Sequence, residues 1–100
     1  MYARIARLKG NPGKIDDLIA DISKQGPDPP PPPGLEEMKG VYVLVDRDNG
    51  NIVTITLWED KQAMDKSTAA GHKAWGRFKQ LADTGEPKVE TYEVGFKKIL

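Results

Sequence analysis

The sequence holds one histidine, His72, and no cysteine. An imidazole titrates near neutral pH, so a lone histidine can act as a general base or as an axial ligand of haem iron. An apolar stripe follows in the sequence, made of Ala74, Trp75, Phe78, Leu81 and Ala82. On a continuous helix with about 100° per residue, His72 lies about 60° from Trp75, at the flank of this stripe. Two interpretations stay open for His72: a catalytic residue that handles a proton, or a histidine at the surface.

The absence of cysteine excludes disulfides, thiolate metal sites and a cysteine nucleophile. The acidic residues are spread along the predicted helices, and a single histidine does not make a ligand set. We therefore expect no metal site and no bound cofactor.

Aromatic side chains are the second group that could do chemistry. Trp58 ends a predicted strand and Trp75 lies on a predicted helix, and either indole could stack on a planar ligand. Trp75 falls on the apolar stripe of its helix, so the alternative is a core residue. Trp58 shares its strand face with Thr54 and Thr56, a mixture of aromatic and polar groups typical of ligand pockets. Two tyrosines add phenolic groups on neighbouring strands, and the predicted substrate-binding residues are Trp58, Trp75, Tyr42 and Tyr92.

The N-terminal part of the chain predicts a strand followed by a helix. Residues 2–8 have an extended pattern with charges inside it, which indicates a strand rather than a secretory signal peptide. Asn11 and Pro12 open a helix, because Asn can accept from the free N–H groups of the first turn and Pro suits the first helical position. The apolar residues that follow share one helical face: Ile15, Leu18, Ile19 and Ile22.

A β-hairpin is predicted over residues 41–58. Residues 41–45 and 52–58 have strand patterns, and Asn49-Gly50 between them tolerates the positive φ of a tight turn. Glu59-Asp60 then begins a second helical region, which Gly71 interrupts. The last strand is predicted over residues 89–96, with Tyr92, Val94 and Phe96 on one face.

This order, β-α-β-β-α-β, predicts an α+β fold of the ferredoxin-like class, with one antiparallel sheet covered on one face by both helices. The central strands carry apolar side chains on both faces, whereas a solvated sheet face should alternate with polar residues. The uncovered face needs a partner, and a second copy of the same sheet is the simplest one. We therefore expect a homodimer that associates through the sheet face.

A proline-rich loop occupies residues 27–34 of what we expect to be a single domain spanning residues 1–100. Successive prolines have fixed φ angles and few donors, so the run over residues 27–33 should lie as exposed polyproline II. It could be a ligand for a proline-binding module, or a stiff connection over the domain surface.

The charges of the chain bear on its partners. Fifteen basic and fifteen acidic residues cancel, and they form no basic block. This argues against a nucleic-acid binder and against a polybasic membrane-surface protein. No apolar run approaches the roughly 20 residues that span a bilayer, so we expect a cytoplasmic protein without membrane or nucleic-acid partners.

Four stretches together resemble the antibiotic biosynthesis monooxygenase domain family across nearly the whole chain. They are residues 11–18, 56–59, 63–67 and 89–94. The resemblance implies a dimeric α+β barrel, with a pocket in each subunit between the sheet and the helices. It also implies oxygenation of electron-rich aromatic substrates without metal, flavin or haem, in which the protein binds the ring, excludes water and stabilises an anion.

Three functions follow as hypotheses. The first is a cofactor-independent monooxygenase of small aromatic or polyphenolic substrates, with His72 or a tyrosine handling the proton. The second is a non-catalytic dimeric domain that binds a small hydrophobic ligand or acts in regulation. The third is haem degradation. The resemblance implies that this reaction would need an Asn on the first strand, a Trp and a His on a helix. Residues 2–8 contain no Asn, so haem degradation is not expected.

Overall fold

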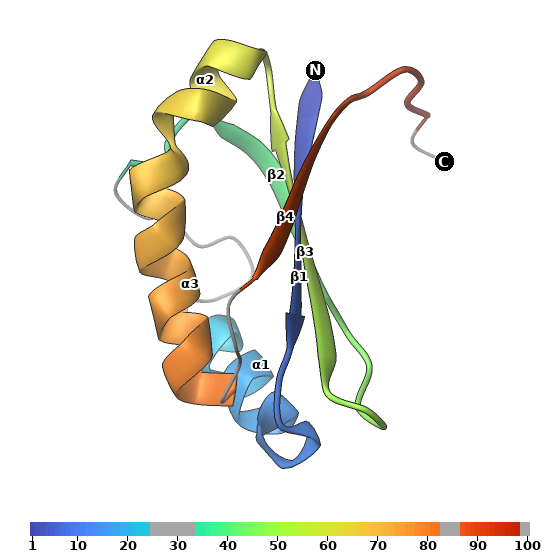
Figure 1. The fold of residues 1–100 in the computed structure, drawn as a ribbon, viewed down its shortest axis with the longest axis vertical. Helices are drawn as coiled ribbons and strands as arrows, with labels where there is room; N and C mark the ends of the chain where they lie inside the picture. Colours follow the sequence, from blue (N-terminus) through green and yellow to red (C-terminus); the bar gives the residue numbers. More distant parts are fainter. Residues whose placement is uncertain (25–33, 83–86, 99–100) are drawn as a thin grey trace.

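The computed structural model describes residues 1–24, 34–82 and 87–98, and within them one sheet carries helices on a single face (Figure 1). The strands are β1 (Tyr2–Lys9), β2 (Met38–Val45), β3 (Asn51–Trp58) and β4 (Lys88–Glu93). They lie in the order β2-β3-β1-β4, and each is antiparallel to its neighbours. The predicted α+β, ferredoxin-like fold is confirmed.

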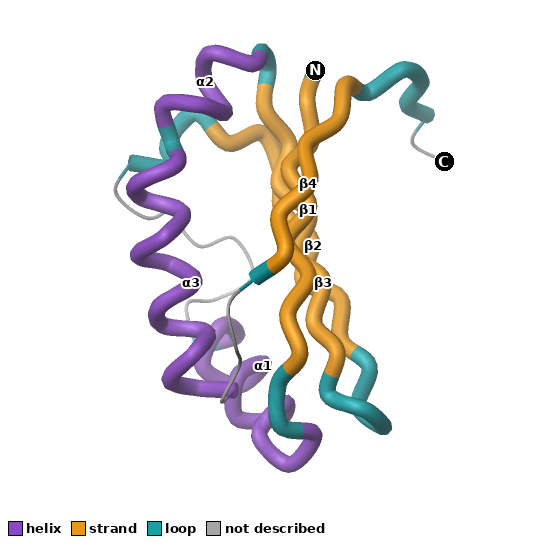
Figure 2. The backbone as a smooth tube through the Cα atoms, viewed as in Figure 1, coloured by secondary structure: helices purple, strands orange, loops and turns teal. Residues whose placement is uncertain are grey.

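The helical layer comprises the 3₁₀ helix η1 (Pro12–Lys14) and the helices α1 (Ile15–Ser23), α2 (Lys61–Lys66) and α3 (Thr68–Ala82). Figure 2 shows these helices on one side of the strands, with the other side of the sheet uncovered. No helix in the described part of the chain is both long and apolar enough to span a bilayer. The proline run over residues 27–33 lies outside the described residues.

Side-chain caps start the helices where the sequence predicts. The Asn11 side chain accepts a hydrogen bond from the Gly13 N–H at 2.9 Å, and Asp60 accepts one from Ala63 N–H at 2.8 Å. Asn11 caps a 3₁₀ turn, after which the α-helix begins at Ile15. These acceptors satisfy N–H groups that have no partner inside the helix.

The predicted hairpin turn is confirmed at Gly50, whose φ is +83°. A Cβ at this position would lie 2.3 Å from the Gly10 carbonyl oxygen. The Gly10 N–H in turn donates to the Gly50 carbonyl at 2.8 Å. Glycine is therefore required both by the left-handed backbone and by the close approach of the loop that follows β1.

The second helical region breaks at Ser67, so the predicted break at Gly71 is wrong. The Ser67 hydroxyl donates to the Met64 carbonyl at 2.6 Å, which ends α2 with a local side-chain bond. α3 then runs through Gly71, whose N–H donates to the Ser67 carbonyl at 2.8 Å. His72 accordingly lies inside α3 rather than at a helix start.

The last strand is shorter than the predicted 89–96, because β1 begins at Tyr2 and offers no partner further on. The Val94 N–H still donates to the Met1 carbonyl at 2.8 Å. Beyond this bond the chain leaves the sheet on its uncovered side (Figure 1), and the Phe96 side chain is 84% exposed.

Two apolar clusters fill the space between the sheet and the helices. The first joins buried residues of β1, β3 and α1: Ala6, Leu8, Ile15, Leu18 and Ile52. The second joins the other end of β3 to α2 and the segment before β2: Leu35, Trp58, Ala63 and Met64.

Candidate functional site

Polar side chains lie between the two apolar clusters, on the face of the sheet that the helices cover. We call Arg4, Thr54, Thr56 and Ser67 the polar band. Arg4, Thr54 and Ser67 are buried, and Thr56 is half-buried. Arg4 pairs with Thr56 across the β1–β3 ladder, so the two side chains share a face. Buried polar groups interrupt a dry core at a cost, and they are typical of ligand sites.

The Arg4 guanidinium reaches the junction between α2 and α3. Its Nη2 donates to the Met64 carbonyl at 2.6 Å and to Thr68 Oγ1 at 3.4 Å. Its Nη1 donates to Ser67 Oγ at 3.0 Å. The guanidinium thus binds the carboxyl end of α2, where the free carbonyl groups and the helix dipole favour a cation.

The surroundings of Arg4 place its charge in a poorly hydrated environment. Burial lowers the pKa of the Arg4 guanidinium below its ordinary value, and the negative charge of Asp65 partly offsets this shift. The guanidinium carbon also lies 5.7 Å from the centre of the Trp58 ring, within the range of a cation–π interaction. Gly71 faces this group from α3, since a Cβ there would be 3.5 Å from Arg4 Nη1.

Trp58 is tied into the polar band through its indole N–H. The ring is 1% exposed and belongs to the second apolar cluster. Its Nε1 donates to Thr56 Oγ1 at 3.0 Å, and the Thr56 hydroxyl lies 3.5 Å from the Arg4 carbonyl, to which it donates. Trp58 therefore combines a core ring with a polar contact, as buried tryptophans usually do.

The predicted substrate-binding residues whose side chains the structure describes lie on both faces of the sheet. Trp58 faces the helices, whereas Tyr42 and Tyr92 lie on the uncovered face, since they pair in register with Ile55 and Ala3. Both tyrosines are exposed. Trp75 and His72 belong to α3 by their backbone, and their side chains are outside the described part of the structure. The roles predicted for these residues, and the catalytic role of His72, stay predictions.

Arg4 and Ser67 are site residues that the sequence analysis did not identify. In the sequence, Arg4 is one of two charged residues within the strand pattern of residues 2–8. A signal was available, because Arg4 occupies the same strand face as Ala6 and Leu8, and an arginine on a core-facing position is uncommon. Ser67 gave no such signal, since its burial depends on where α2 ends.

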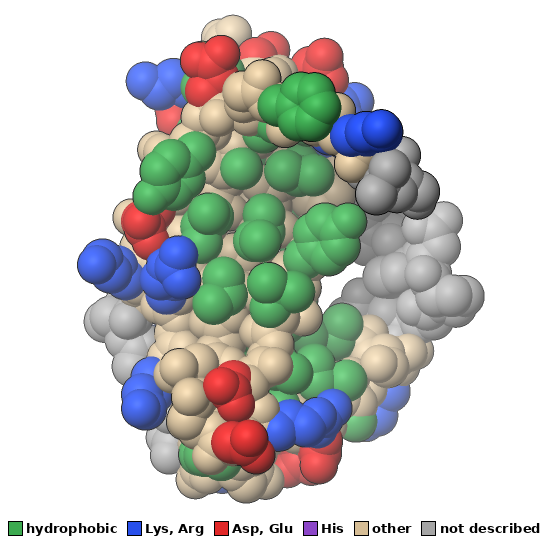
Figure 3. Space-filling model, turned by 90° about the vertical axis from the view of Figure 1, so that its right-hand side faces the viewer, with side chains coloured by type: hydrophobic (Ala, Val, Ile, Leu, Met, Phe, Trp, Pro, Cys, Tyr) green, Lys and Arg blue, Asp and Glu red, His purple; other side chains and the backbone are tan. Residues whose placement is uncertain are grey.

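The uncovered face of the sheet carries an apolar patch with charged side chains around it (Figure 3). The ladder registers place on this face, which we call the open face, the apolar residues Ala3, Ile5, Tyr42, Leu44, Val53, Ile55, Leu57 and Tyr92. Tyr42, Leu44 and Tyr92 are about half exposed. Contiguous apolar area of this kind on a sheet marks an interaction surface.

A polar network lies at the β4 side of the open face. Arg7 Nε donates to Glu90 Oε1 at 2.7 Å, and the Tyr92 hydroxyl donates to Glu90 Oε2 at 2.6 Å. The bond from Tyr92, followed by that from Arg7, lowers the pKa of the Glu90 carboxyl, while Glu90 raises the pKa of the Tyr92 phenol. All three groups are thereby held in fixed positions on the surface.

We expect Tyr92→Phe to raise the pKa of Glu90 toward that of an ordinary glutamate, because the variant removes the hydrogen bond that lowers this pKa most. In the wild type the folded pKa is depressed, so this contribution to stability is present above the unfolded pKa and is lost as pH falls through the folded value. Carboxyl chemical shifts followed by NMR titration measure the pKa directly. Tyr42→Phe is the matched control, and an unchanged Glu90 pKa in Tyr92→Phe would show that the bond does not form.

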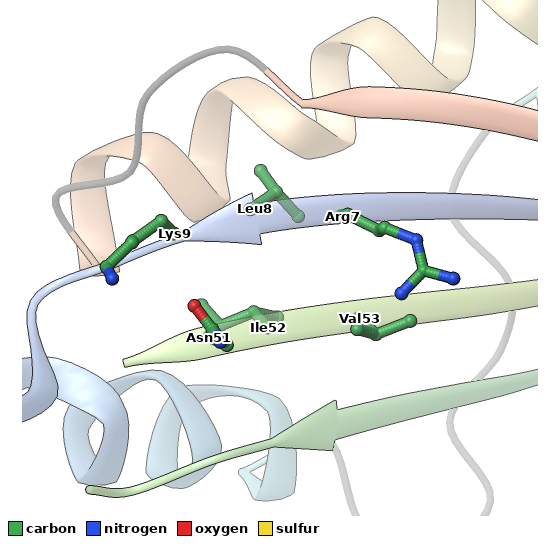
Figure 4. A pocket seen from close by; sticks show the side chains of 6 residues that line it. All are labelled: Arg7, Leu8, Lys9, Asn51, Ile52 and Val53. Atoms are coloured by element: carbon green, nitrogen blue, oxygen red, sulfur yellow. The ribbon is translucent and has the colours of Figure 1, made fainter. Parts of the chain in front are cut away.

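A depression of about 400 Å³ lies at the end of the β1–β3 ladder (Figure 4). It is lined by Arg7, Leu8, Lys9, Asn51, Ile52 and Val53. Lys9 pairs with Asn51 at this end, whereas Tyr2 pairs with Trp58 at the other end of the same two strands. The depression is therefore separate from the polar band and contains none of the predicted site residues.

No protein-family model matches the sequence, and no curated protein does either. Several solved structures share its fold. One is a Deinococcus radiodurans protein assigned by name to the antibiotic biosynthesis monooxygenases, with 18% identity, a TM-score of 0.63, and coverage of 100% of this chain and 98% of that one. Another, assigned by the same name, is from Chloroflexus aurantiacus, with 18% identity, a TM-score of 0.62, and coverage of 98% and 97%.

A third structure is SnoaB from Streptomyces nogalater, named a cofactor-independent oxygenase. It has 14% identity and a TM-score of 0.60, and the match covers 96% of this chain and 94% of SnoaB. Likeness at this level of identity extends over the whole fold and not to activity. The chain thus has the fold of the antibiotic biosynthesis monooxygenase proteins, as its sequence resemblance predicted.

Proposed function

We propose that the protein is a cofactor-independent monooxygenase of small aromatic or polyphenolic substrates. The observation that carries this proposal is the polar band, which places a buried cation beside an indole in a fold shared with a cofactor-independent oxygenase. Such an oxygenase needs a site that holds an aromatic ring and stabilises negative charge away from water.

The reaction can be balanced for an anthrone, a substrate with an acidic methylene group beside aromatic rings. Loss of a proton gives a delocalised carbanion, which donates electrons to dioxygen and forms a peroxide at that carbon. Loss of water from the protonated peroxide leaves a carbonyl group. One dioxygen thus converts the methylene group into a carbonyl group and one water, and the substrate supplies all the electrons.

In this proposal the residues of the chain have separate roles. Arg4 stabilises the anion that forms on proton loss, because a cation in a poorly hydrated site interacts strongly with developing negative charge. His72 is the proposed base, because it is the one histidine of the sequence and it lies on α3, which packs on the covered side of the sheet (Figure 1). Histidine is the side chain that most often serves as a general base.

We also propose that two copies associate through the open face. Support comes from its apolar residues, which alternate along β2, β3 and β1 with those that face the helices. A sheet with one solvated face would carry polar residues there. The same face on two copies can pack on itself about a two-fold axis, which is the commonest arrangement in homodimers.

Oxygen uptake tests the enzymatic proposal. With a panel of anthrones and quinols, we expect uptake of one dioxygen for each anthrone converted to a quinone. His72→Ala should lower kcat by about 100-fold or more, the usual contribution of a general base. Lys73→Ala, which changes an exposed neighbour on α3, is the matched control and should retain activity. No uptake above the protein-free rate with any member of the panel would contradict the proposal.

A non-catalytic ligand-binding domain is the second candidate. It is favoured by the make-up of the polar band, whose described side chains include no carboxylate and no imidazole to take a proton. Saturable binding of the same aromatic compounds without oxygen uptake would support this function over the first.

A further inference from the structure

We infer that the tip of the β2–β3 hairpin is a modification site, at which Asn49 converts spontaneously into aspartate or isoaspartate when the turn opens. Asn49 is the only asparagine of the sequence that is followed by a glycine. Because glycine has no side chain, its backbone nitrogen can approach the preceding carboxamide more closely than that of any other residue. This site is independent of the function proposed above, and the turn that contains it controls the rate of the reaction.

The chemistry needs only these two residues and water. The Gly50 backbone nitrogen attacks Cγ of the Asn49 side chain and loses its proton, while the C–N bond of the carboxamide breaks and ammonia leaves. A cyclic imide, the succinimide, results. Water then adds to either of the carbonyl carbons of the imide and opens the ring, which gives aspartate or isoaspartate at position 49. No group is oxidised or reduced, and each product has a hydroxyl oxygen in place of the lost amino group.

The closed turn restrains both reacting groups. Gly50 is buried, and its N–H donates to the Asp46 carbonyl at 2.8 Å, so this nitrogen is neither free nor in contact with bulk water. The Asn49 side-chain oxygen accepts from the Asn51 N–H at 3.0 Å, which directs the carboxamide toward Asn51. The Asp46 carboxylate also accepts from the Asp48 N–H at 3.0 Å. A hydrogen-bonded, buried amide reacts with solvent only through local opening, so the tip must open before Asn49 can react.

The product should not fit the closed turn. The Gly50 carbonyl accepts from the Gly10 N–H at 2.8 Å, and this approach is so close that a Cβ on Gly50 would lie 2.3 Å from the Gly10 oxygen. Isoaspartate inserts its side-chain methylene group into the backbone and so lengthens the chain between Asp46 and Gly50. We therefore expect conversion to isoaspartate to break the bond between Gly10 and Gly50 and to loosen this end of the sheet.

Ageing of the whole protein at mildly alkaline pH tests the inference. Peptide mapping by mass spectrometry measures the fraction converted at each asparagine, in native buffer and in guanidinium chloride. We expect conversion at Asn49 in both, at least about 10-fold more slowly in native buffer, because the folded tip opens only part of the time. The internal controls are Asn11 and Asn51, which precede proline and isoleucine and should stay unchanged over the same period.

Two variants separate opening of the turn from the chemistry. Asp46→Ala removes the carboxylate that accepts from the Asp48 N–H. It should speed conversion in native buffer roughly 5-fold, the usual strength of one hydrogen bond, and leave the rate in guanidinium chloride unchanged. Asp48→Ala is the matched control, because it removes the same charge from the same turn, and the Asp48 side chain makes no hydrogen bond to a residue that the structure describes. The ratio of the two rates is compared, so that effects of sequence on the chemistry cancel.

Three results would overturn the inference. Equal rates in native buffer and in guanidinium chloride would show that the turn does not control the reaction. No conversion in guanidinium chloride would show that Asn49 is not a site of modification. The third concerns the product: the isoaspartate form, separated by ion-exchange chromatography, should exchange its Gly10 amide hydrogen at least about 10-fold faster than the unmodified protein, and an unchanged rate would show that the closed turn accepts it.

Discussion

Leu44→Lys should convert the protein from dimer to monomer, with a dissociation constant raised roughly 1,000-fold or more. Leu44 lies on the open face, where we propose that a second copy packs. A lysine there would bury an unpaired charge, which costs about 3–5 kcal/mol, and two-fold symmetry applies the cost twice. Because about 1.4 kcal/mol corresponds to a factor of ten, the association would be lost at micromolar concentration. Sedimentation velocity measures the change in mass.

Val41→Lys is the matched control for this experiment. Val41 lies on the same strand with almost the same exposure, 50% against 48% for Leu44. Its side chain points to the opposite face of the sheet, because it is an odd number of residues away along β2. It should leave the dimer intact. A wild type that sediments as a monomer, or equal dissociation by both variants, would rule out association through the open face.

Trp58→Ala should lower the free energy of unfolding by about 4 kcal/mol, the usual cost of truncating a fully buried tryptophan. The ring is 1% exposed, contacts α2 and the segment before β2, and donates its N–H to Thr56. Since small domains are stable by about 5–15 kcal/mol, this is a large part of the total. Urea denaturation measures it in the monomeric Leu44→Lys background, so that association does not contribute.

Two further variants help to explain the loss of stability in Trp58→Ala: one removes only the hydrogen bond of the indole, and the other is a control on an exposed ring. Thr56→Val removes only the acceptor of the indole N–H and should cost about 1 kcal/mol, or somewhat more if the donor stays buried without a partner. Phe96→Ala truncates an aromatic ring that is 84% exposed and should stay within about 0.5 kcal/mol of its parent. A loss below about 1 kcal/mol in Trp58→Ala would mean that the ring is not part of the core.

The fold was predictable from local signals that depend on few residues. Asn49-Gly50 set the hairpin, and Asp60 set the start of α2, because each side chain or φ angle acts within its own turn. The end of α2 was not predictable in this way. It depends on Ser67, which binds Met64 within the helix and Arg4 from a strand more than 60 residues earlier. Gly71 predicts a break because glycine disfavours a helix, and the position of Arg4 next to it in the folded protein is not visible in the sequence.

The candidate site was predictable only in part, for a related reason. Side chains alternate between the two faces of a strand, which predicts that Trp58, Thr54 and Thr56 share one face. The structure confirms this shared face. Tyr42 and Tyr92 were grouped with Trp58 because of their chemistry, whereas the ladder register puts them on the other face. The sequence does not single out Arg4, because a charged residue on a strand is common and its burial is visible only in the structure.

The separation of the two apolar clusters bears on how this fold could change over time. None of the four residues of the polar band is a member of either cluster. Substitutions within the band can therefore alter what the protein binds while both clusters keep their packing. We expect such a substitution to cost less stability than the truncation of a cluster residue such as Trp58. A small domain divided in this way can keep its architecture and still diversify in chemistry.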